Sequence, residues 1–262
     1  VLSSKMGSID NAIEYFQKAY EIQIVKYGEE HTTIATTLHN ISSMLLSKEE
    51  YDKALEYALK AFEIRGKILG NNNVKTASTY ELVGGIYDNK GDKEEALKHY
   101  NRSLEIKMKI FEQDHISISN SYNNIAMLHD SKGDYKQALD YLFKALSIRE
   151  KELGSDNDRT LIVYNNIGMV YYSMGKYKDA MEYIHRVLSG YKKIFTESHQ
   201  IYAGIYVNIG DIYFAQEDYS KSLEYYQLSQ EILLKYYPED HRKVIAVKEK
   251  INEINSIINS NK

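Results

Sequence analysis

The sequence predicts an all-α protein built as an array of antiparallel helix pairs, and three observations support that prediction. The first is that the chain has 262 residues and one proline, whereas average usage would give roughly a dozen prolines. Proline cannot donate a backbone hydrogen bond inside a helix, so its scarcity favours a nearly continuous helical chain. The second and third observations are a repeat of fixed length and columns of small residues inside that repeat.

The repeat is visible as a pattern of a large residue, a small residue, an aliphatic residue and an aromatic one. Its copies begin at residues 9, 51, 93, 135, 177 and 219. Successive copies are 42 residues apart, and no insertion or deletion breaks the register. A fixed period of this length indicates a solenoid of stacked helix pairs.

Two sets of columns, each with small residues at fixed points, define the helices of each pair. The first helix carries a mostly aromatic column and, four residues on, the small column Ser42, Gly84, Ala126, Gly168 and Gly210. Two further columns, three and seven residues after the aromatic one, hold large side chains. These spacings place the aromatic, small and large columns on one helix face. The second helix carries the small column Ala54, Ala96, Ala138, Ala180 and Ser222. Small residues in both helices allow a close approach of the two backbones.

Turns and linkers are expected between these helices. The turn inside each pair contains Gly7, Gly91, Gly133 and Gly175, with Glu49 and Glu217 as the two exceptions. Glycine suits such a position because it adopts left-handed dihedral angles without a Cβ clash. We expect the next helix to be capped by residues such as Thr32, Asn73, Ser117 and Asp158. The single proline, Pro238, lies in the last linker.

The columns divide the chain into three parts. Residues 1–27 would hold the end of a first helix and a full second helix, residues 28–237 five complete repeats, and residues 238–262 a capping helix and tail. Lys248, Asn252 and Asn255 replace the large, small and aromatic columns in this last helix, as a solvent-facing cap requires. The first part has no such cap, so we expect further repeats before Val1.

At this point the sequence resembles a known family. The sequence pattern is similar to the tetratricopeptide repeat. Its first helix carries a large aromatic residue, an aliphatic residue, a small residue and Tyr, and its second helix begins with Gly-x-Tyr-x-x-Ala-Leu. The 42-residue period and the segments at 145–154 and 164–168 are more similar to the kinesin light chain type. The resemblance implies a right-handed superhelical solenoid whose first helices line a concave groove. The sequence departs from that type where it usually has proline after the linker His, because His31, for example, is followed by Thr.

Composition excludes several kinds of site. The chain has no Cys, so it contains no disulfide, thiolate metal site or Cys nucleophile. The formal net charge of −4 does not predict binding to nucleic acid or to an anionic membrane. No apolar run reaches the roughly 18 residues that span a bilayer, and we expect a cytoplasmic protein. The eight His residues show no metal-ligand spacing, and those of the linkers are interpreted as helix-entry residues. We therefore predict no catalytic residue, no metal and no cofactor.

The groove is the predicted functional site, and the resemblance assigns its residues position by position. Asn side chains would bind the backbone of an extended peptide, because a primary amide offers both a donor and an acceptor. Met and Tyr side chains would provide an apolar anchor, and carboxylates would flank it. The predicted amides are Asn40, Asn123, Asn124, Asn165, Asn166 and Asn208. The predicted apolar anchor is Met127, Met169 and Tyr172. The predicted carboxylates are Asp88, Asp130 and Asp211.

These residues favour a non-enzymatic scaffold that binds an extended or helical segment of a partner protein. An amphipathic or mildly basic segment fits the carboxylates better than an acidic one. An alternative interpretation of the Asn residues is that they belong to the repeat consensus and stabilise helix packing. Two other functions stay open: a peptide-sensing arm that controls an attached effector domain, and an architectural segment of a large assembly bound through another face.

Overall fold

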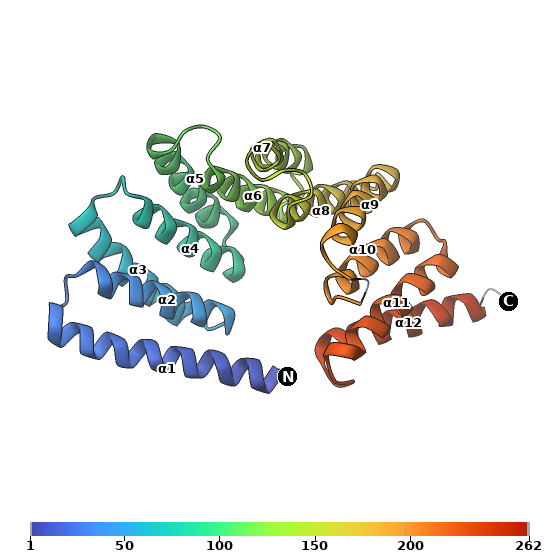
Figure 1. Ribbon diagram of the computed structural model, residues 1–262, viewed down its shortest axis with the longest axis horizontal. Helices are drawn as coiled ribbons and strands as arrows, with labels where there is room; N and C mark the ends of the chain where they lie inside the picture. The colour runs from blue at the N-terminus through green and yellow to red at the C-terminus, as the bar shows by residue number, and fades with distance from the viewer. Residues whose placement is uncertain (1, 197, 261–262) are drawn as a thin grey trace. The chain divides into compact units, whose positions relative to one another are not determined.

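The computed structural model describes residues 2–196 and 198–260, with side chains from residue 9 onward. Val1 and residues 261–262, which belong to the predicted first and last parts, lie outside the described residues. Over the described ranges the chain forms twelve α-helices and no strand (Figure 1). The all-α prediction is therefore confirmed for them.

The chain divides into two compact units, which we call the N-terminal unit (Leu2–Asp134) and the C-terminal unit (from Tyr135). The helices of the N-terminal unit are α1 Leu2–Tyr27, α2 Thr32–Ser47, α3 Tyr51–Leu69, α4 Val74–Lys90, α5 Lys93–Ile110 and α6 Ile116–Ser131. Those of the C-terminal unit are α7 Tyr135–Leu153, α8 Asp158–Ser173, α9 Tyr177–Ile194, α10 Ile201–Ala215, α11 Tyr219–Tyr236 and α12 Arg242–Ser260.

Within each unit, helices pack on their neighbours in the chain. The tightest pairs are α2 with α3 and α4 with α5 in the N-terminal unit, and α8 with α9 and α10 with α11 in the C-terminal unit. Each pair then packs against the next through the second helix of one and the first helix of the other, as in α3 with α4 and α9 with α10. This is the helix-pair array that the 42-residue period predicts. We call α2, α4, α6, α8 and α10 the first helices.

The small columns lie where the two helices of a pair approach most closely. A Cβ added at Gly84 would stand 2.8 Å from Cδ1 of Tyr100, so the ring occupies the space that glycine leaves. Where serine replaces glycine or alanine, its hydroxyl bonds the facing backbone. Ser42 Oγ donates to the carbonyl oxygen of Ala54 at 2.7 Å, and Ser222 Oγ donates to that of Gly210 at 2.9 Å.

The turn residues behave as predicted, with one exception at the start of the chain. Gly91 ends α4 in the left-handed region at φ 86°. Glu49 and Glu217 keep the same conformation at φ 64° and 63°, which costs a residue with a Cβ roughly 1 kcal/mol or more. The predicted turn at Gly7 is wrong, because α1 continues through it as one helix of 26 residues. A hairpin turn is favoured only when the helix before it can pack back on the helix after it.

The linkers between pairs confirm one predicted cap and correct three others by one or two residues. Asn73 is an N-cap as expected, with Oδ1 accepting from the Lys75 amide at 2.9 Å. The caps predicted at Thr32, Ser117 and Asp158 are wrong; the N-caps there are His31, His115 and Asn157. The linker histidines therefore accept through Nδ1, as when His115 takes the Ser117 amide at 3.1 Å.

Each of these histidines also stacks on an aromatic ring four residues earlier. The centroid distances are 4.5 Å for Tyr27–His31, 3.9 Å for Phe111–His115, 4.0 Å for Phe195–His199 and 4.1 Å for Tyr237–His241. Where the cap is Asn73 or Asn157, the residue four positions earlier is Leu69 or Leu153. The aromatic residue and the histidine thus change together, because the ring needs a flat partner to stack on.

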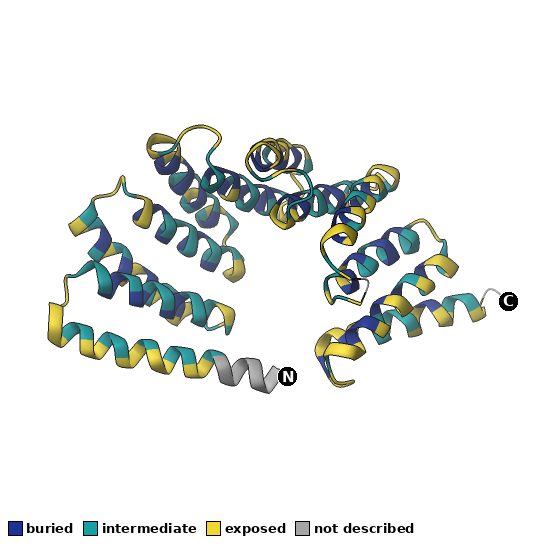
Figure 2. Cartoon of the chain, in the orientation of Figure 1, coloured by how far each residue is buried: buried dark blue, intermediate teal, exposed yellow. Residues whose placement is uncertain are grey.

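Buried side chains gather between the helices, and the exposed residues lie on the outward faces (Figure 2). In the C-terminal unit one cluster joins α8 to α12 and includes Tyr202 and Tyr226, both almost completely buried. The last helix, α12, adds Val244, Val247 and Ile254 to this cluster. At the other end of the chain, α1 packs against α2, and Tyr15 on α1 is 71% exposed.

Candidate functional site

All twelve predicted site residues lie on first helices and are half-buried. They fall into two groups of six that belong to different units. The N-terminal unit holds Asn40, Asp88, Asn123, Asn124, Met127 and Asp130. The C-terminal unit holds Asn165, Asn166, Met169, Tyr172, Asn208 and Asp211. Each group is described within its own unit.

The structure brings two of the predicted amides into direct contact. Asn208 on α10 donates from Nδ2 to Oδ1 of Asn165 on α8, at 2.8 Å. This bond uses one hydrogen of Asn208 and one lone pair of Asn165. The Nδ2 group of Asn165 and the Oδ1 atom of Asn208 still offer a donor and an acceptor side by side. That is the pair of groups that complements one peptide unit of a bound segment.

The predicted carboxylates have structural partners in two of three cases. Asp211 accepts a hydrogen bond from the Tyr226 hydroxyl, and burial raises the pKa of Asp211. Asp88 accepts from Lys93 Nζ at 2.5 Å. Burial also raises the pKa of Asp130, and among the described residues its Oδ1 atom has no hydrogen-bond partner. Because Asp88 and Asp211 are fixed by protein groups, they are less available to a ligand than the sequence suggested.

The predicted apolar anchor is divided. Met169 and Tyr172 pack against the main cluster of the C-terminal unit, where the Tyr172 ring lies 6.0 Å from the ring of Tyr177. Met127 belongs to the N-terminal unit. Burial raises the pKa of the Tyr172 hydroxyl, so this side chain is neutral and presents an apolar ring with a polar tip.

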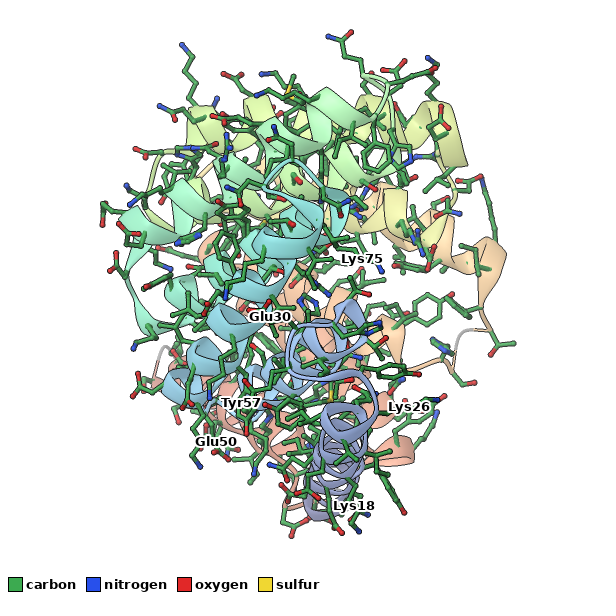
Figure 3. All side chains as sticks on the ribbon, turned by 90° about the vertical axis from the view of Figure 1, so that its left-hand side faces the viewer. Lys18, Lys26, Glu30, Glu50, Tyr57 and Lys75 are labelled. Carbon is green, nitrogen blue, oxygen red and sulfur yellow. The ribbon has the colours of Figure 1, made fainter. Side chains whose placement is uncertain are left out.

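A column of buried cations on the second helices was not predicted. Arg65 on α3 is 4% exposed. It donates through Nη1 to the carbonyl oxygen of Lys75 at 2.8 Å and to Oγ1 of Thr79 at 2.6 Å, both on α4. The same nitrogen lies 3.4 Å from Nδ1 of His39 on α2. Burial and the Arg65 charge lower the pKa of His39 to about 4. Figure 3 shows Lys75 near the start of α4, above the α1–α2 linker that holds Glu30.

One repeat later, Lys107 on α5 has the same role. Its Nζ donates to Glu81 Oε1 at 2.6 Å, to Ser121 Oγ at 3.1 Å and to the carbonyl oxygen of Ser117 at 3.2 Å. Ser121 also donates to Glu81 Oε1 at 2.7 Å. We call this arrangement, in which a buried cation joins a second helix to the next first helix, a polar junction. His39 and Glu81 occupy the column of Asn123 and Asn165, so that column faces the junction.

The column of buried cations on the second helices changes from charged to uncharged residues along the C-terminal unit. Arg149 still donates to a backbone carbonyl, that of Arg159 on α8. The next members are Tyr191 and Leu233. Tyr191 is 5% exposed, burial raises its pKa, and its hydroxyl donates to the carbonyl oxygen of Asp158 at 3.5 Å. We call the contact of α9 with α8 and α10 around Tyr191 the apolar junction.

The apolar junction contains a pocket of about 250 Å³. Gly204 lies at this pocket, and among the described residues, apart from the nearby backbone of α10 and the two chain neighbours, no atom lies within 4 Å of the place where its Cβ would stand. The predicted Asn165 and Asn208 form part of the wall, whereas the other lining residues were not predicted. The lining residues are Leu161, Ile162, Asn165, Val187, Tyr191, Ile201, Gly204, Ile205 and Asn208. A signal for the pocket was present in the sequence. The column of buried cations changes to Tyr191, and the column of larger residues that includes Ile162 changes to Gly204.

Two kinds of site have no support in the described residues. In residues 2–196 and 198–260, no three His, Cys, Asp or Glu side chains gather in a way that would hold a metal ion. In the same residues no helix combines the length and the apolar composition needed to cross a bilayer.

Comparison with protein families now defines the class. The tetratricopeptide repeat profile matches residues 2–67, 33–109, 75–151 and 117–193, and a second profile of that repeat matches residues 203–232. The chain belongs to the tetratricopeptide repeat family. No catalytic family is among these matches. A search of curated proteins gave no match.

Solved structures of the same fold include kinesin light chain-like repeats. BtubC (BKLC) from P. vanneervenii is 19% identical, with a TM-score of 0.67 over 92% of this chain and 96% of that one. A putative kinesin light chain from Podospora anserina with nearly identical TPR-like repeats is 18% identical, with a TM-score of 0.66 over 79% and 98%. A Rap protein complexed with Competence and Sporulation Factor is 17% identical, with a TM-score of 0.66 over 100% and 74%. At these identities the similarity concerns the fold.

Proposed function

We propose that this protein is a non-enzymatic scaffold that binds an extended or helical segment of a partner protein along its first helices. The observation that carries the proposal is the row of half-buried amides on one face of the first helices, with Asn165 and Asn208 hydrogen-bonded to each other. Membership of the repeat family supports it, and a Rap protein of this fold is known in complex with a separate factor. The predicted cytoplasmic location is compatible with this function and stays a prediction.

The recognition mechanism is described for each unit by itself. In the C-terminal unit Asn166 and Asn208 would bind the backbone of the partner segment, and Met169 and Tyr172 would contact its apolar side chains. In the N-terminal unit Asn124 and Met127 would have the same two roles. Each net hydrogen bond contributes about 0.5–1.5 kcal/mol, so the amides alone give modest affinity. Micromolar binding, on the order of −8 kcal/mol, requires apolar anchoring in addition. Asp130 would favour a mildly basic segment over an acidic one.

The test uses a phage-displayed library of random dodecapeptides, selected on the wild-type chain. Peptides that bind are then measured against Asn124→Leu, Asn166→Leu and the double variant. Asn101→Leu on the second helix α5 is the matched control. We expect each first-helix variant to weaken binding several-fold, about 1 kcal/mol per lost hydrogen bond, with helicity unchanged. Equal affinity for the folded double variant would remove the amides from the mechanism.

One observation favours a second candidate function, assembly through α1. On this helix Tyr15, Ile22 and Val25 are 71%, 68% and 89% exposed. The equivalents of Ile22 on α5, α7 and α11, namely Ile106, Ile148 and Ile232, are buried. An exposed face with buried equivalents indicates a contact surface. Sedimentation of the wild-type chain and of Ile22→Lys tests this function; assembly that the substitution leaves unchanged would contradict it.

A further inference from the structure

The pocket at the apolar junction lies where three columns hold residues unlike those of the polar junctions. In the polar junctions a long cation, Arg65 or Lys107, fills the space between second helix and next first helix and bonds Thr79 or Ser121. At the apolar junction the cation is replaced by Tyr191. The hydroxyl partner is replaced by Ile205, which is 4% exposed. Neither Tyr191 nor Ile205 has a long flexible side chain like that of Arg65 or Lys107. Part of the space between the second helix and the next first helix therefore stays open as the pocket.

The third change is at the pocket mouth. The column of Gly204 holds Thr36, Ser78 and Asn120 in the N-terminal unit and Ile162 on α8. Glycine within a helix lowers its stability by roughly 0.5–1 kcal/mol relative to alanine, and at Gly204 no neighbouring atom requires the absence of a side chain. Gly204 therefore contrasts with Gly84, where a ring occupies the space. A helical glycine that faces an open pocket leaves room for something outside the chain.

The lining of the pocket specifies the chemistry of its occupant. No Asp, Glu, Lys, Arg or His is among the lining residues, so a charged group placed there would lose its hydration without gaining a partner. Aliphatic side chains form most of the wall, and Ile162 at the mouth is 46% exposed. The volume of about 250 Å³ lies below the roughly 300–1,000 Å³ typical of pockets for whole small molecules. It is the size for one side chain.

The polar groups at the pocket identify what the side chain is attached to. Asn165 and Asn208 are hydrogen-bonded to each other through one N–H and one lone pair, so each amide keeps at least one donor and one acceptor. We propose that the apolar junction binds one aliphatic or aromatic side chain of an extended peptide, while Asn165 and Asn208 bond the peptide unit beside it. This inference rests on the proposed function and names the chemistry of the partner. The C-terminal unit thereby contains the anchoring pocket that the amides alone lack.

The test fills the pocket without introducing charge. Peptides selected from the dodecapeptide library are measured against Gly204→Leu, whose side chain would occupy the open space. Ser78→Leu is the control, because it introduces the same leucine in the same column of the N-terminal unit. We expect Gly204→Leu to weaken binding at least about tenfold, because the peptide side chain can no longer be buried. Ser78→Leu keeps the wild-type affinity.

An alanine scan of the selected peptides gives the complementary result. One apolar position should be essential for binding to the wild-type chain and unimportant for binding to Gly204→Leu. Selected peptides that bind Gly204→Leu as well as the wild type would overturn the pocket and leave the amide face intact as the binding site. Peptides whose essential residue is acidic or basic would overturn the assignment of an apolar side chain.

A second probe separates the failure of the pocket from the failure of the proposed function. N-acetyl-leucine methylamide carries one apolar side chain between two peptide units. We expect it to shift the methyl NMR signals of Val187 and Ile205 in the wild type and in Ser78→Leu, but not in Gly204→Leu. If no library peptide binds, the proposed function fails, and the methyl shifts still decide the pocket. Absence of those shifts would overturn the pocket.

Discussion

The polar junction at Lys107 and the apolar junction at Tyr191 are built from the same columns of the same repeat. In the first, a buried ammonium group meets Glu81, Ser121 and a backbone carbonyl. In the second, a tyrosine with one long hydrogen bond lies among aliphatic side chains, beside a pocket. The comparison teaches that the same columns can hold two packed helices together in two ways, through a buried cation with several hydrogen bonds or through apolar side chains. In the second case the residues also line a pocket.

The two regions differ in a second way, in which helix of a pair carries the larger of two contacting side chains. In the N-terminal unit Ala77 on α4 and Ile106 on α5 are both fully buried. Their equivalents in the C-terminal unit are Leu161 and Gly190, and a Cβ on Gly190 would stand 2.4 Å from Cδ2 of Leu161. The large residue has moved from the second helix to the first. Because Leu161 also lines the pocket, this exchange helps to shape it.

The largest expected effect breaks the polar junction. Lys107→Ala removes three hydrogen bonds and leaves Glu81 with an uncompensated charge, so we expect a loss of about 3 kcal/mol of stability. Tyr191→Phe, at the same column of the apolar junction, removes only the 3.5 Å bond to Asp158 and should change little. Urea denaturation measures both. Lys107→Met combined with Glu81→Gln should recover most of the loss, and a failure to recover would show that the charge is not the cause.

The next largest effect tests the exchange of size. Gly190→Ile forces a branched side chain against Leu161, and overpacking of this kind costs about 1–3 kcal/mol or more. Adding Leu161→Ala restores the arrangement of Ala77 with Ile106, so the double variant should regain most of the wild-type stability. The thermal midpoints of the two single variants and the double variant form a cycle. Additive losses in this cycle would mean that the two positions are independent.

A smaller, pH-dependent effect should be confined to the N-terminal unit. Burial and Arg65 lower the pKa of His39 to about 4 from the ordinary 6.5. Neutral His39 is therefore favoured in the folded state, and its contribution is complete above pH 6.5 and is lost as the pH falls from 6.5 towards 4. We expect a loss on the order of 2 kcal/mol near pH 4.5.

The measurement is the free energy of unfolding from pH 7 to pH 4.5 for wild type and His39→Gln. The variant should lose less stability than the wild type over this range, because it has no imidazole to protonate beside the Arg65 guanidinium. Parallel curves for the two proteins would exclude His39 as the source of the pH dependence.

The smallest effect concerns a turn. Glu217 keeps the left-handed conformation of the glycines that replace it in other repeats, at φ 63°. Glu217→Gly removes the Cβ clash but adds freedom to the unfolded chain, so we expect a net gain of a few tenths of a kcal/mol to about 1 kcal/mol. Glu224→Gly, at an exposed helical position of α11, should instead lower the thermal midpoint. A lower midpoint for Glu217→Gly would show that the left-handed glutamate is not strained.

The fold could be predicted from the sequence because each helix pair repeats the same column chemistry. The close approach at Gly84 and the left-handed turn at Gly91 follow from the lack of a Cβ at one position. The caps at His31 and His115 were misplaced by one and two residues, since a histidine is a rarer N-cap than serine, threonine, asparagine or aspartate. Its stacking on Phe111 or Phe195 stabilises it there.

The site could be predicted only in part, because its shape depends on compensation between columns. Reading one column at a time identifies Asn165 and Asn208 as amides on the first helices. It does not show that Leu161 is large where Gly190 is small, or that Tyr191 and Ile205 line one pocket at columns where the polar junctions pair a cation with a hydroxyl. Those pairs are 14 or 29 residues apart in sequence, and they become neighbours only after the helices pack.

The most direct test of the central claim is an intermolecular NOE experiment with methyl-labelled protein and a peptide selected on the wild-type chain. We predict NOEs from one apolar side chain of the peptide to Val187 and Ile205, and from the adjacent peptide NH to the side chain of Asn208. These NOEs should disappear in Gly204→Leu. NOEs confined to residues on the outward faces of the second helices, with none to Val187 or Ile205, would contradict the account.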